Sequence, residues 1–341
     1  MTNRAVLLAN LGSPDQPDTA SVRRYLNQFL MDPFVIQLPW VLRRMIVSLF
    51  VLPRRPKSSA EAYQSIWTEE GSPLVVLSDR LLKAVQKKTD VPVAMSMRYG
   101  KPSIESELIK LANTDGVDEV LFIPMYPHFA DSTIKTSVVE AQRVIEQHKL
   151  AVKLTVFQPF YQRDDYIDAL AASTKPWINA DNNFDHVLFS YHGLPESHLI
   201  KADPTGTHCL KSADCCQIAS DAHASCYRHQ VLRTTECFVE KTGLRPEQYS
   251  IAFQSRLGKA KWLEPSTVDT LEKLAKSGVK KLLVMCPAFV TDCLETLEEI
   301  ELAGAEQFEE AGGESLTLIP CLNDHEQWVS VISNWCEKYP G

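Results

Sequence analysis

Eight short apolar runs rich in β-branched residues recur along the 341-residue chain, and they constrain its fold more than any other feature. Each run has the length of a buried strand, and segments with helical periodicity lie between several of them, at residues 103–113, 132–148, 267–276 and 292–311. Strands that alternate with helices predict parallel sheets covered on both faces. The predicted strands are residues 5–11, 91–97, 119–125, 153–157, 186–191, 249–253, 281–286 and 315–320.

These strands divide into two sets of four near residue 155. The run IPMYPHFADST (123–133) is similar to VMCPAFVTDCLE (284–295), with a slip of one residue, which favours an internal duplication. We therefore expect an α/β fold of two Rossmann-like lobes, each with a four-stranded parallel sheet flanked by helices. The expected boundaries are 1–155 for the N-terminal lobe, 156–322 for the C-terminal lobe and 323–341 for a C-terminal helix.

Composition and the apolar segments exclude several classes of function. The net charge of −8 argues against broad nucleic-acid binding, and no Gly-rich phosphate loop follows a predicted strand. The apolar run at 5–9 is too short for a secretory signal, so we expect a cytoplasmic protein. The stretch 38–53 is interrupted by Arg43 and Arg44 and is too short to cross a bilayer. The wider segment 39–57 is either a lip that rests on a membrane or a helix buried against the core, with the two arginines exposed.

The first candidate site lies in FSYHGLP (189–195), where His192 stands at the carboxyl end of a predicted strand. Ligands of parallel α/β sheets gather at this edge. A buried histidine satisfied by backbone groups explains the residue equally well.

The second candidate site lies in CPAFVTDCLETLEEI (286–300), where a helix is predicted to begin near Asp292. The i, i+3, i+7 spacing of Asp292, Glu295 and Glu299 predicts one stripe of that helix. Acids in a first turn also suit the helix dipole, although Glu299 is two turns in. An imidazole near carboxylates can move protons near neutral pH and bind a divalent metal transiently.

Seven segments of the chain resemble ferrochelatases, enzymes that insert Fe²⁺ into protoporphyrin IX to make protohaem. The similarity runs in the right order through nearly the whole chain, which makes it more specific than any one motif. It implies a chelatase-like fold, a role in haem biosynthesis, and Fe²⁺ and protoporphyrin IX as partners. The segments are LANLGSPD (8–15), EEGSPL (69–74), MRYGKP (97–102), YPHFADST (126–133), FSYHGLP (189–195), FQSRLGKAKWLEP (253–265) and FVTDCLETLEE (289–299).

This resemblance assigns roles to individual residues. His192 matches the catalytic histidine, which takes pyrrole protons or ligates the incoming iron, and Glu295 matches its partner across the cleft. Asp292 and Glu299 continue from that pair as a conduit for protons or metal. Where some members have a histidine after the conduit aspartate, this chain has Cys293, so that histidine's role does not transfer. The implied porphyrin contacts are Leu11, Arg55 (with a propionate), Arg98, Tyr99, Trp262 and Phe289.

Four of the nine cysteines fall together in a polar insertion at residues 203–227. Four thiolates suit Zn²⁺ or an iron–sulfur cluster, and their spacing does not choose between these. A subset of ferrochelatases carries a [2Fe–2S] cluster on cysteines, some of them internal, so the resemblance implies a cluster here. Zinc and unliganded thiols stay as alternatives, and Cys237, His208 and His223 stay as reserve ligands. The expected ligands are Cys209, Cys215, Cys216 and Cys226.

Two other functions stay open. One is a chelatase for another tetrapyrrole, either a coproporphyrin ferrochelatase or a cobaltochelatase. The other is a non-catalytic haem-binding protein. The sequence sets no expectation for the oligomeric state.

Overall fold

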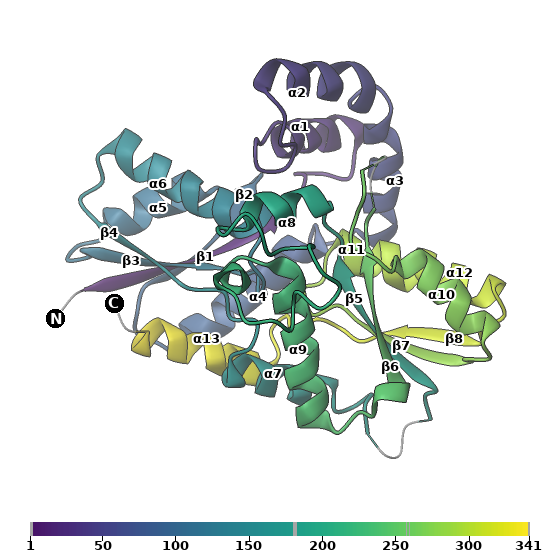
Figure 1. Cartoon of the computed structure of the whole chain (residues 1–341). Helices are drawn as coiled ribbons and strands as arrows, with labels where there is room; N and C mark the ends of the chain where they lie inside the picture. Colours follow the sequence, from purple (N-terminus) through teal and green to yellow (C-terminus); the bar gives the residue numbers. More distant parts are fainter. Residues whose placement is uncertain (1–2, 180–182, 257, 259, 340–341) are drawn as a thin grey trace. The chain divides into compact units, whose positions relative to one another are not determined.

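The computed structural model describes residues 3–179, 183–256, 258 and 260–339. Residue contacts divide the chain into two units (Figure 1), each described by itself below. The N-terminal unit comprises Met1–Tyr126, Asp131–Gln158 and Trp328–Gly341, and the C-terminal unit comprises Pro127–Ala130 and Pro159–Gln327. The change of unit after Gln158 lies close to the expected boundary at 155. The expected C-terminal helix is α13 (Glu326–Lys338), most of which belongs to the N-terminal unit.

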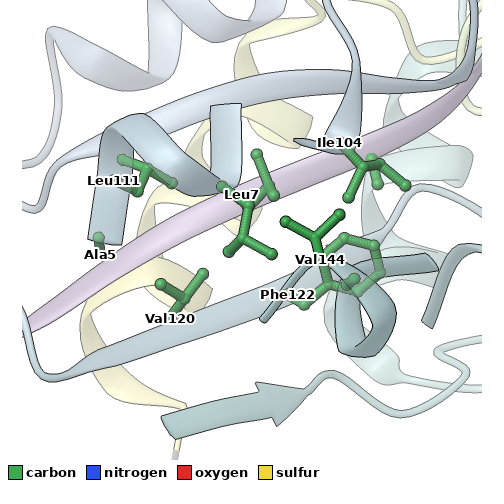
Figure 2. Packing of buried hydrophobic residues seen from close by; sticks show 10 residues of the cluster. Ala5, Leu7, Ile104, Leu111, Val120, Phe122 and Val144 are labelled. Carbon is green, nitrogen blue, oxygen red and sulfur yellow. The ribbon is translucent and has the colours of Figure 1, made fainter. Parts of the chain in front are cut away.

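The N-terminal unit is built on a parallel sheet in the order β2-β1-β3-β4. Its strands are β1 (Arg4–Gly12), β2 (Val93–Tyr99), β3 (Glu119–Pro124) and β4 (Lys153–Val156). Leu7 of β1 and Phe122 of β3 form a core with Ile104 and Val144 (Figure 2). The other elements are α1 (Thr19–Leu30), α2 (Trp40–Ile46), the π-helix η1 (Val47–Val51), α3 (Arg55–Ile66), α4 (Pro73–Gln86), α5 (Ile104–Ala112), the π-helix η2 (Asp131–Lys135) and α6 (Thr136–His148).

The C-terminal unit has the matching sheet, in the order β6-β5-β7-β8 and again parallel. Its strands are β5 (His186–His192), β6 (Tyr249–Gln254), β7 (Lys281–Met285) and β8 (Ser315–Leu318). The predicted fold class and all eight predicted strands are therefore confirmed. The other elements are α7 (Asp164–Thr174), α8 (Glu196–Ala202), η3 (Asp221–Ala224), α9 (Tyr227–Thr242), η4 (Pro246–Gln248), α10 (Thr267–Lys276), α11 (Leu294–Thr296), the π-helix η5 (Leu297–Gly304) and α12 (Ala305–Glu310).

The turn that follows the edge strand β2 or β6 is built alike in the two units. Each turn contains a cis X-Pro bond, at Lys101-Pro102 and at Glu264-Pro265. The serine after each proline caps the next helix, because the Ser103 and Ser266 hydroxyls accept backbone N–H groups of the first turn. The connection from strand to cis-proline is short in the N-terminal unit and extended over residues 255–264 in the C-terminal unit.

The first strands β1 and β5 also end alike. Leu11 is the next-to-last residue of β1 and His192 is the last residue of β5, and a glycine comes directly after each. A Cβ at Gly12 would lie 1.7 Å from the Tyr99 carbonyl oxygen, and one at Gly193 would lie 2.7 Å from that of Gln254. The close approach of the neighbouring strand thus requires glycine at both places.

No helix within the described part of the chain combines the length and the apolar character needed to cross a bilayer.

Candidate active site

His192 lies at the carboxyl end of β5 and is half-buried. Its carbonyl oxygen accepts a hydrogen bond from the Tyr227 hydroxyl at 2.8 Å, and the Phe289 ring lies edge-on to the imidazole with centroids 6.2 Å apart. None of the described groups forms a hydrogen bond with the imidazole itself. The alternative of a buried histidine satisfied by backbone groups is therefore not supported.

A cavity of about 220 Å³ lies beside the residue that follows this histidine. Gly193, Gln254 and Trp262 contribute to its walls. Trp262 is held there because it forms a β-bridge with Pro195. Pockets for drug-sized ligands measure roughly 300–1,000 Å³, so this cavity accommodates only part of a large ligand.

Gln254 connects the histidine strand with the acidic segment. It pairs with His192 in the sheet, and its side-chain amide donates to the Glu295 carbonyl oxygen at 2.6 Å and to the Glu299 carboxylate at 3.4 Å. Ser255 also binds Glu299, through its backbone N–H at 2.7 Å and its hydroxyl at 2.5 Å. The structure therefore brings Glu295 and Glu299 to the edge of the sheet where His192 stands.

The acidic segment contains one more carboxylate than the sequence comparison singled out. Burial, and then the charges of Glu299 and Glu295, raise the pKa of Glu298. These like charges repel one another, and a cation that binds between them relieves the repulsion. In the sequence, Glu298 stands three residues after Glu295, and this i, i+3 spacing was a signal that could have pointed to it.

The helix expected to begin near Asp292 begins instead at Leu294, and Asp292 lies in the preceding loop. The prediction of one stripe through Asp292, Glu295 and Glu299 is therefore wrong. Glu299 lies in the π-helix η5, whose wider turns do not keep the α-helical register.

Asp292 is buried, and its carboxylate is occupied by donors of the same unit. It accepts hydrogen bonds from the Thr296 hydroxyl at 2.9 Å, the Asn323 amide at 2.6 Å and the Cys321 backbone N–H at 3.2 Å. Sequence reasoning missed both Cys321 and Asn323, because they lie beyond β8. The side chain thus ties the loop before α11 to the loop after β8.

Arg98 and Tyr99 of the N-terminal unit meet on one carboxylate oxygen of Asp32. Arg98 binds it at 2.6 Å and the Tyr99 hydroxyl donates to it at 2.9 Å. Tyr99 is fully buried, and this burial together with the Asp32 charge raises its pKa. Tyr99 therefore offers no surface to a ligand here and supports Arg98. Leu11 is half-buried at the end of β1, and Arg55 is exposed at the first position of α3.

The four cysteines of the insertion are all buried and lie together. Hydrogen bonding from the Cys216 thiol lowers the pKa of Cys226 to about 6, while burial and the Cys226 charge raise the pKa of Cys209 to about 12. Cys215 is near enough to Cys209 and Cys216 to raise the pKa of both. Within the described residues, no set of three or more His, Cys, Asp or Glu side chains has an arrangement that holds a metal ion. The thiols lie near enough to shift one another's pKa.

Polar groups hold the backbone of this insertion. The Asp203 carboxylate accepts the backbone N–H groups of Thr205, His208 and Cys209, each at 2.9 Å. The reserve ligand His208 binds the Cys215 carbonyl oxygen at 2.7 Å, and His223 binds the same oxygen at 3.1 Å. Both reserve histidines thus support the backbone of the insertion.

Two α/β units of matching strand order, with ionisable side chains at the strand ends of one of them, agree with the chelatase-like fold that the resemblance implies. The chain belongs to the ferrochelatase family, whose model matches residues 3–339.

Similar proteins extend over the full length of the chain. A ferrochelatase of Ectopseudomonas mendocina is 59% identical over 342 residues, which cover 100% of this chain and 99% of that protein. Ferrochelatases of Stutzerimonas stutzeri and Azotobacter vinelandii are 58% and 56% identical, with coverage of 99% and 100% of those proteins and 100% of this chain. A solved Deinococcus radiodurans protein, described as structurally similar to chelatases, has a TM-score of 0.49 at 12% identity, covering 100% of this chain and 56% of that one. That last likeness carries no weight in the assignment.

Proposed function

We propose that this chain is a lyase that inserts Fe²⁺ into protoporphyrin IX, giving protohaem and two protons. The observation that carries the proposal is His192, whose imidazole has no hydrogen-bond partner among the described groups and stands at the sheet edge that Gln254 links to Glu295 and Glu299. Full-length identity of 59% to a ferrochelatase supports the same reaction.

Each proposed role follows from the chemistry of the side chain. Neutral imidazole near pH 7 accepts protons, so His192 takes the two pyrrole protons in turn. Fe²⁺ is a substrate, and imidazole nitrogen with carboxylate oxygens suits its transient binding. Glu295 and Glu299, joined by Glu298, carry protons away or guide the cation. Asp292 fixes the loop in front of them, since its oxygens already accept three donors.

The porphyrin contacts are assigned in the same way. Trp262 and Phe289 offer aromatic faces beside His192, as a flat macrocycle requires. Leu11 supplies an apolar wall, and the guanidinium groups of Arg55 and Arg98 suit propionates. Tyr99 positions Arg98 through Asp32, and this role replaces the direct contact expected from the resemblance.

Anaerobic incubation with Fe²⁺ and protoporphyrin IX tests this proposal, with the haem absorption spectrum as the readout. We expect turnover, at a higher kcat/KM than with coproporphyrin III or with Co²⁺. Preference for either of these substrates would support the corresponding chelatase instead. Tight haem retention without turnover would contradict the enzymatic role and support a haem-binding protein.

We also propose that Cys209, Cys215, Cys216 and Cys226 hold a [2Fe–2S] cluster. Four buried cysteines that gather in one insertion supply the donor set that such a cluster takes. Bound there, a cluster supplies redox chemistry and cross-links the insertion. Anaerobically purified protein is expected to show visible charge-transfer absorption and acid-labile sulfide. Stoichiometric zinc without sulfide would support the zinc alternative and contradict the cluster.

We further propose a cytoplasmic protein that rests on anionic membranes through its lip, residues 39–57. Trp40, Val41, Leu49 and Phe50 of the lip are 63%, 68%, 61% and 58% exposed. Arg43 is buried, since its guanidinium donates to the Leu38 carbonyl oxygen at 2.9 Å. A buried helix with both arginines exposed would show the opposite pattern. The exposed apolar side chains suit a helix that lies at a membrane interface.

Flotation with phosphatidylglycerol vesicles tests the lip. The wild-type protein is expected to float, and a Trp40→Ser, Phe50→Ser variant is expected to stay in solution. Val268→Ser removes an apolar side chain that is 56% exposed on α10 and serves as the matched control, which should float. No flotation of the wild-type protein would contradict the proposal.

A further inference from the structure

Tyr227 connects two parts of the C-terminal unit that the proposed function treats separately. It is the first residue of α9 and follows Cys226 directly in the chain. Its side chain is buried, and its hydroxyl donates to the carbonyl oxygen of His192 at 2.8 Å. One tyrosine thus joins the main chain of the proposed catalytic residue to the neighbour of a proposed cluster ligand.

The contact with the strand end is reinforced by aromatic packing. The Tyr227 ring lies edge-on to His128, with centroids 5.7 Å apart, and His128 in turn lies edge-on to Tyr191 at 5.5 Å. The Tyr191 hydroxyl shares a 2.7 Å hydrogen bond with Thr235, which also belongs to α9. Helix α9 therefore holds the end of β5 at two successive residues. Of these two hydrogen bonds, the one from Tyr227 acts on the His192 peptide and the one from Thr235 acts on the Tyr191 side chain.

The other side of Tyr227 is fixed by the thiols. Cys226 is the N-cap residue of α9, and its buried side chain lies near the thiols of Cys209 and Cys216, which both shift its pKa. The side chain of this N-cap residue makes no capping hydrogen bond. The place of the first turn of α9, and so of the Tyr227 hydroxyl, depends on how the four-thiol site holds Cys226.

We infer that Tyr227 is a positioning residue that couples the four-thiol site to His192. An intact site holds Cys226 in place, and this fixes the position of the Tyr227 hydroxyl. The hydroxyl in turn orients the His192 peptide and, with it, the imidazole. Loss of the site loosens the first turn of α9 and lowers the rate of metal insertion without removing any group that touches substrate. This inference rests on the proposed roles of His192 and of the thiols.

Tyr227→Phe tests the positioning role, since it removes the hydroxyl and keeps the ring against His128. We expect kcat to fall about three- to tenfold, as for one net hydrogen bond, with the Kd for protoporphyrin within twofold of wild type. Tyr191→Phe is the matched control, because it also removes a buried hydroxyl between β5 and α9, and it should leave kcat unchanged. Wild-type kcat in Tyr227→Phe, or an equal loss in both variants, would overturn the inference.

A spectroscopic readout tests the same bond without turnover. His192–Gly193 is the only His-Gly pair in the sequence, so ¹³C-carbonyl histidine with ¹⁵N-glycine labelling isolates this one peptide in an NMR spectrum. The His192 carbonyl resonance should move upfield in Tyr227→Phe and stay in place in Tyr191→Phe. No movement in Tyr227→Phe would overturn the inference even if the protein turned out not to insert iron.

A double-mutant cycle tests the coupling to the thiols. Cys226→Ala should lower kcat in the wild-type background and have less than a twofold further effect in Tyr227→Phe. Independent, multiplicative losses, or no loss in Cys226→Ala, would refute the coupling. If Cys226→Ala does not fold, Cys216→Ala takes its place, because it removes a neighbouring thiol that shifts the pKa of Cys226. Sulfide and iron contents, measured on the wild-type protein, report separately on the cluster.

Discussion

The two units carry different chemistry on the same strand order. Near the end of its first strand the N-terminal unit has Leu11, whereas the C-terminal unit has His192. On the adjacent strands, Arg98 of β2 binds the buried Asp32, whereas Gln254 of β6 reaches the acidic segment. A duplicated scaffold can thus keep one copy for ionic anchoring and use the other for proton and metal chemistry.

The same comparison explains where the cavity comes from. Both edge strands lead to a cis-proline followed by a capping serine. The connection to that proline comprises residues 100–101 in the N-terminal unit and residues 255–264 in the C-terminal unit. That extension carries Ser255, which holds Glu299, and Trp262, which lines the cavity. A longer turn in one copy therefore supplies both the wall and the acid support.

The largest expected difference between the copies is in catalysis. His192→Ala should lower kcat about 10²- to 10⁴-fold, because a general base is lost, and should keep the wild-type circular dichroism spectrum. Leu11→Ala at the matching place should lower kcat less than about tenfold, since no proton is transferred there. Steady-state haem formation measures both, and equal losses would remove the functional asymmetry.

The next largest difference is expected between the two buried carboxylates, Asp32 and Asp292, in how much each contributes to the free energy of unfolding. Asp32→Asn leaves the Arg98 guanidinium without its counter-charge and should lower the free energy of unfolding by about 3–5 kcal/mol. Asp292→Asn keeps neutral partners and should cost about 2 kcal/mol. Urea denaturation compares the two variants. A larger loss for Asp292→Asn would show that its environment carries an unrecognised charge.

The glycines that follow the first strands sharpen the comparison further. Gly12→Ala should cost about 3 kcal/mol of unfolding free energy, because φ is +106° and the Tyr99 oxygen occupies the place of a Cβ. Gly193→Ala has no positive φ and should cost about 1–2 kcal/mol. Thermal and urea unfolding test the order, and a reversed order would contradict the matched strand ends.

A difference that depends on pH is expected at the opposite, amino ends of the sheets. Burial alone would raise the pKa of Glu119, but hydrogen bonds from Thr155 and Arg4 bring it below the ordinary 4.5. Its stabilising contribution is therefore present above pH 4.5 and lost as the pH falls through the lowered pKa. Glu119→Gln should cost about 2 kcal/mol at pH 7, and the difference from wild type should shrink below pH 4.5.

Asp185 provides the comparison in the C-terminal unit. Its pKa lies below the ordinary 3.8 because the backbone N–H groups of Lys281 and Lys280 donate to it, and its side chain is exposed. Asp185→Asn should cost less than about 1 kcal/mol at pH 7, fading below pH 3.8. Urea unfolding between pH 7 and pH 3 measures both variants. A cost for Asp185→Asn that matches Glu119→Gln would contradict the role of burial.

The strands and their grouping were predictable because the central runs are buried on both faces of a parallel sheet. The run AVLLA (5–9) of β1 is 0% exposed throughout, so its hydrophobicity alone marks it. The strand-end position of His192 followed from the same argument. Family resemblance then supplied the roles that no periodicity reveals.

The rest depended on contacts between segments far apart in the chain. Asp292 looked like part of a helical stripe, yet Asn323 and Cys321 draw its side chain into a loop, and no local pattern links those residues. The π-helical turn at Glu299 gives no sequence signal of its own. The sequence carries no signal for Tyr227, because only the fold brings its hydroxyl to His192.

Imidazole rescue of His192→Ala tests the central claim most directly. The rate of protohaem formation from Fe²⁺ and protoporphyrin IX is measured anaerobically while the imidazole concentration is raised. If the side chain at position 192 accepts the pyrrole protons, the variant is nearly inactive and regains activity in proportion to added imidazole. A variant that forms haem at the wild-type rate without imidazole would contradict the account.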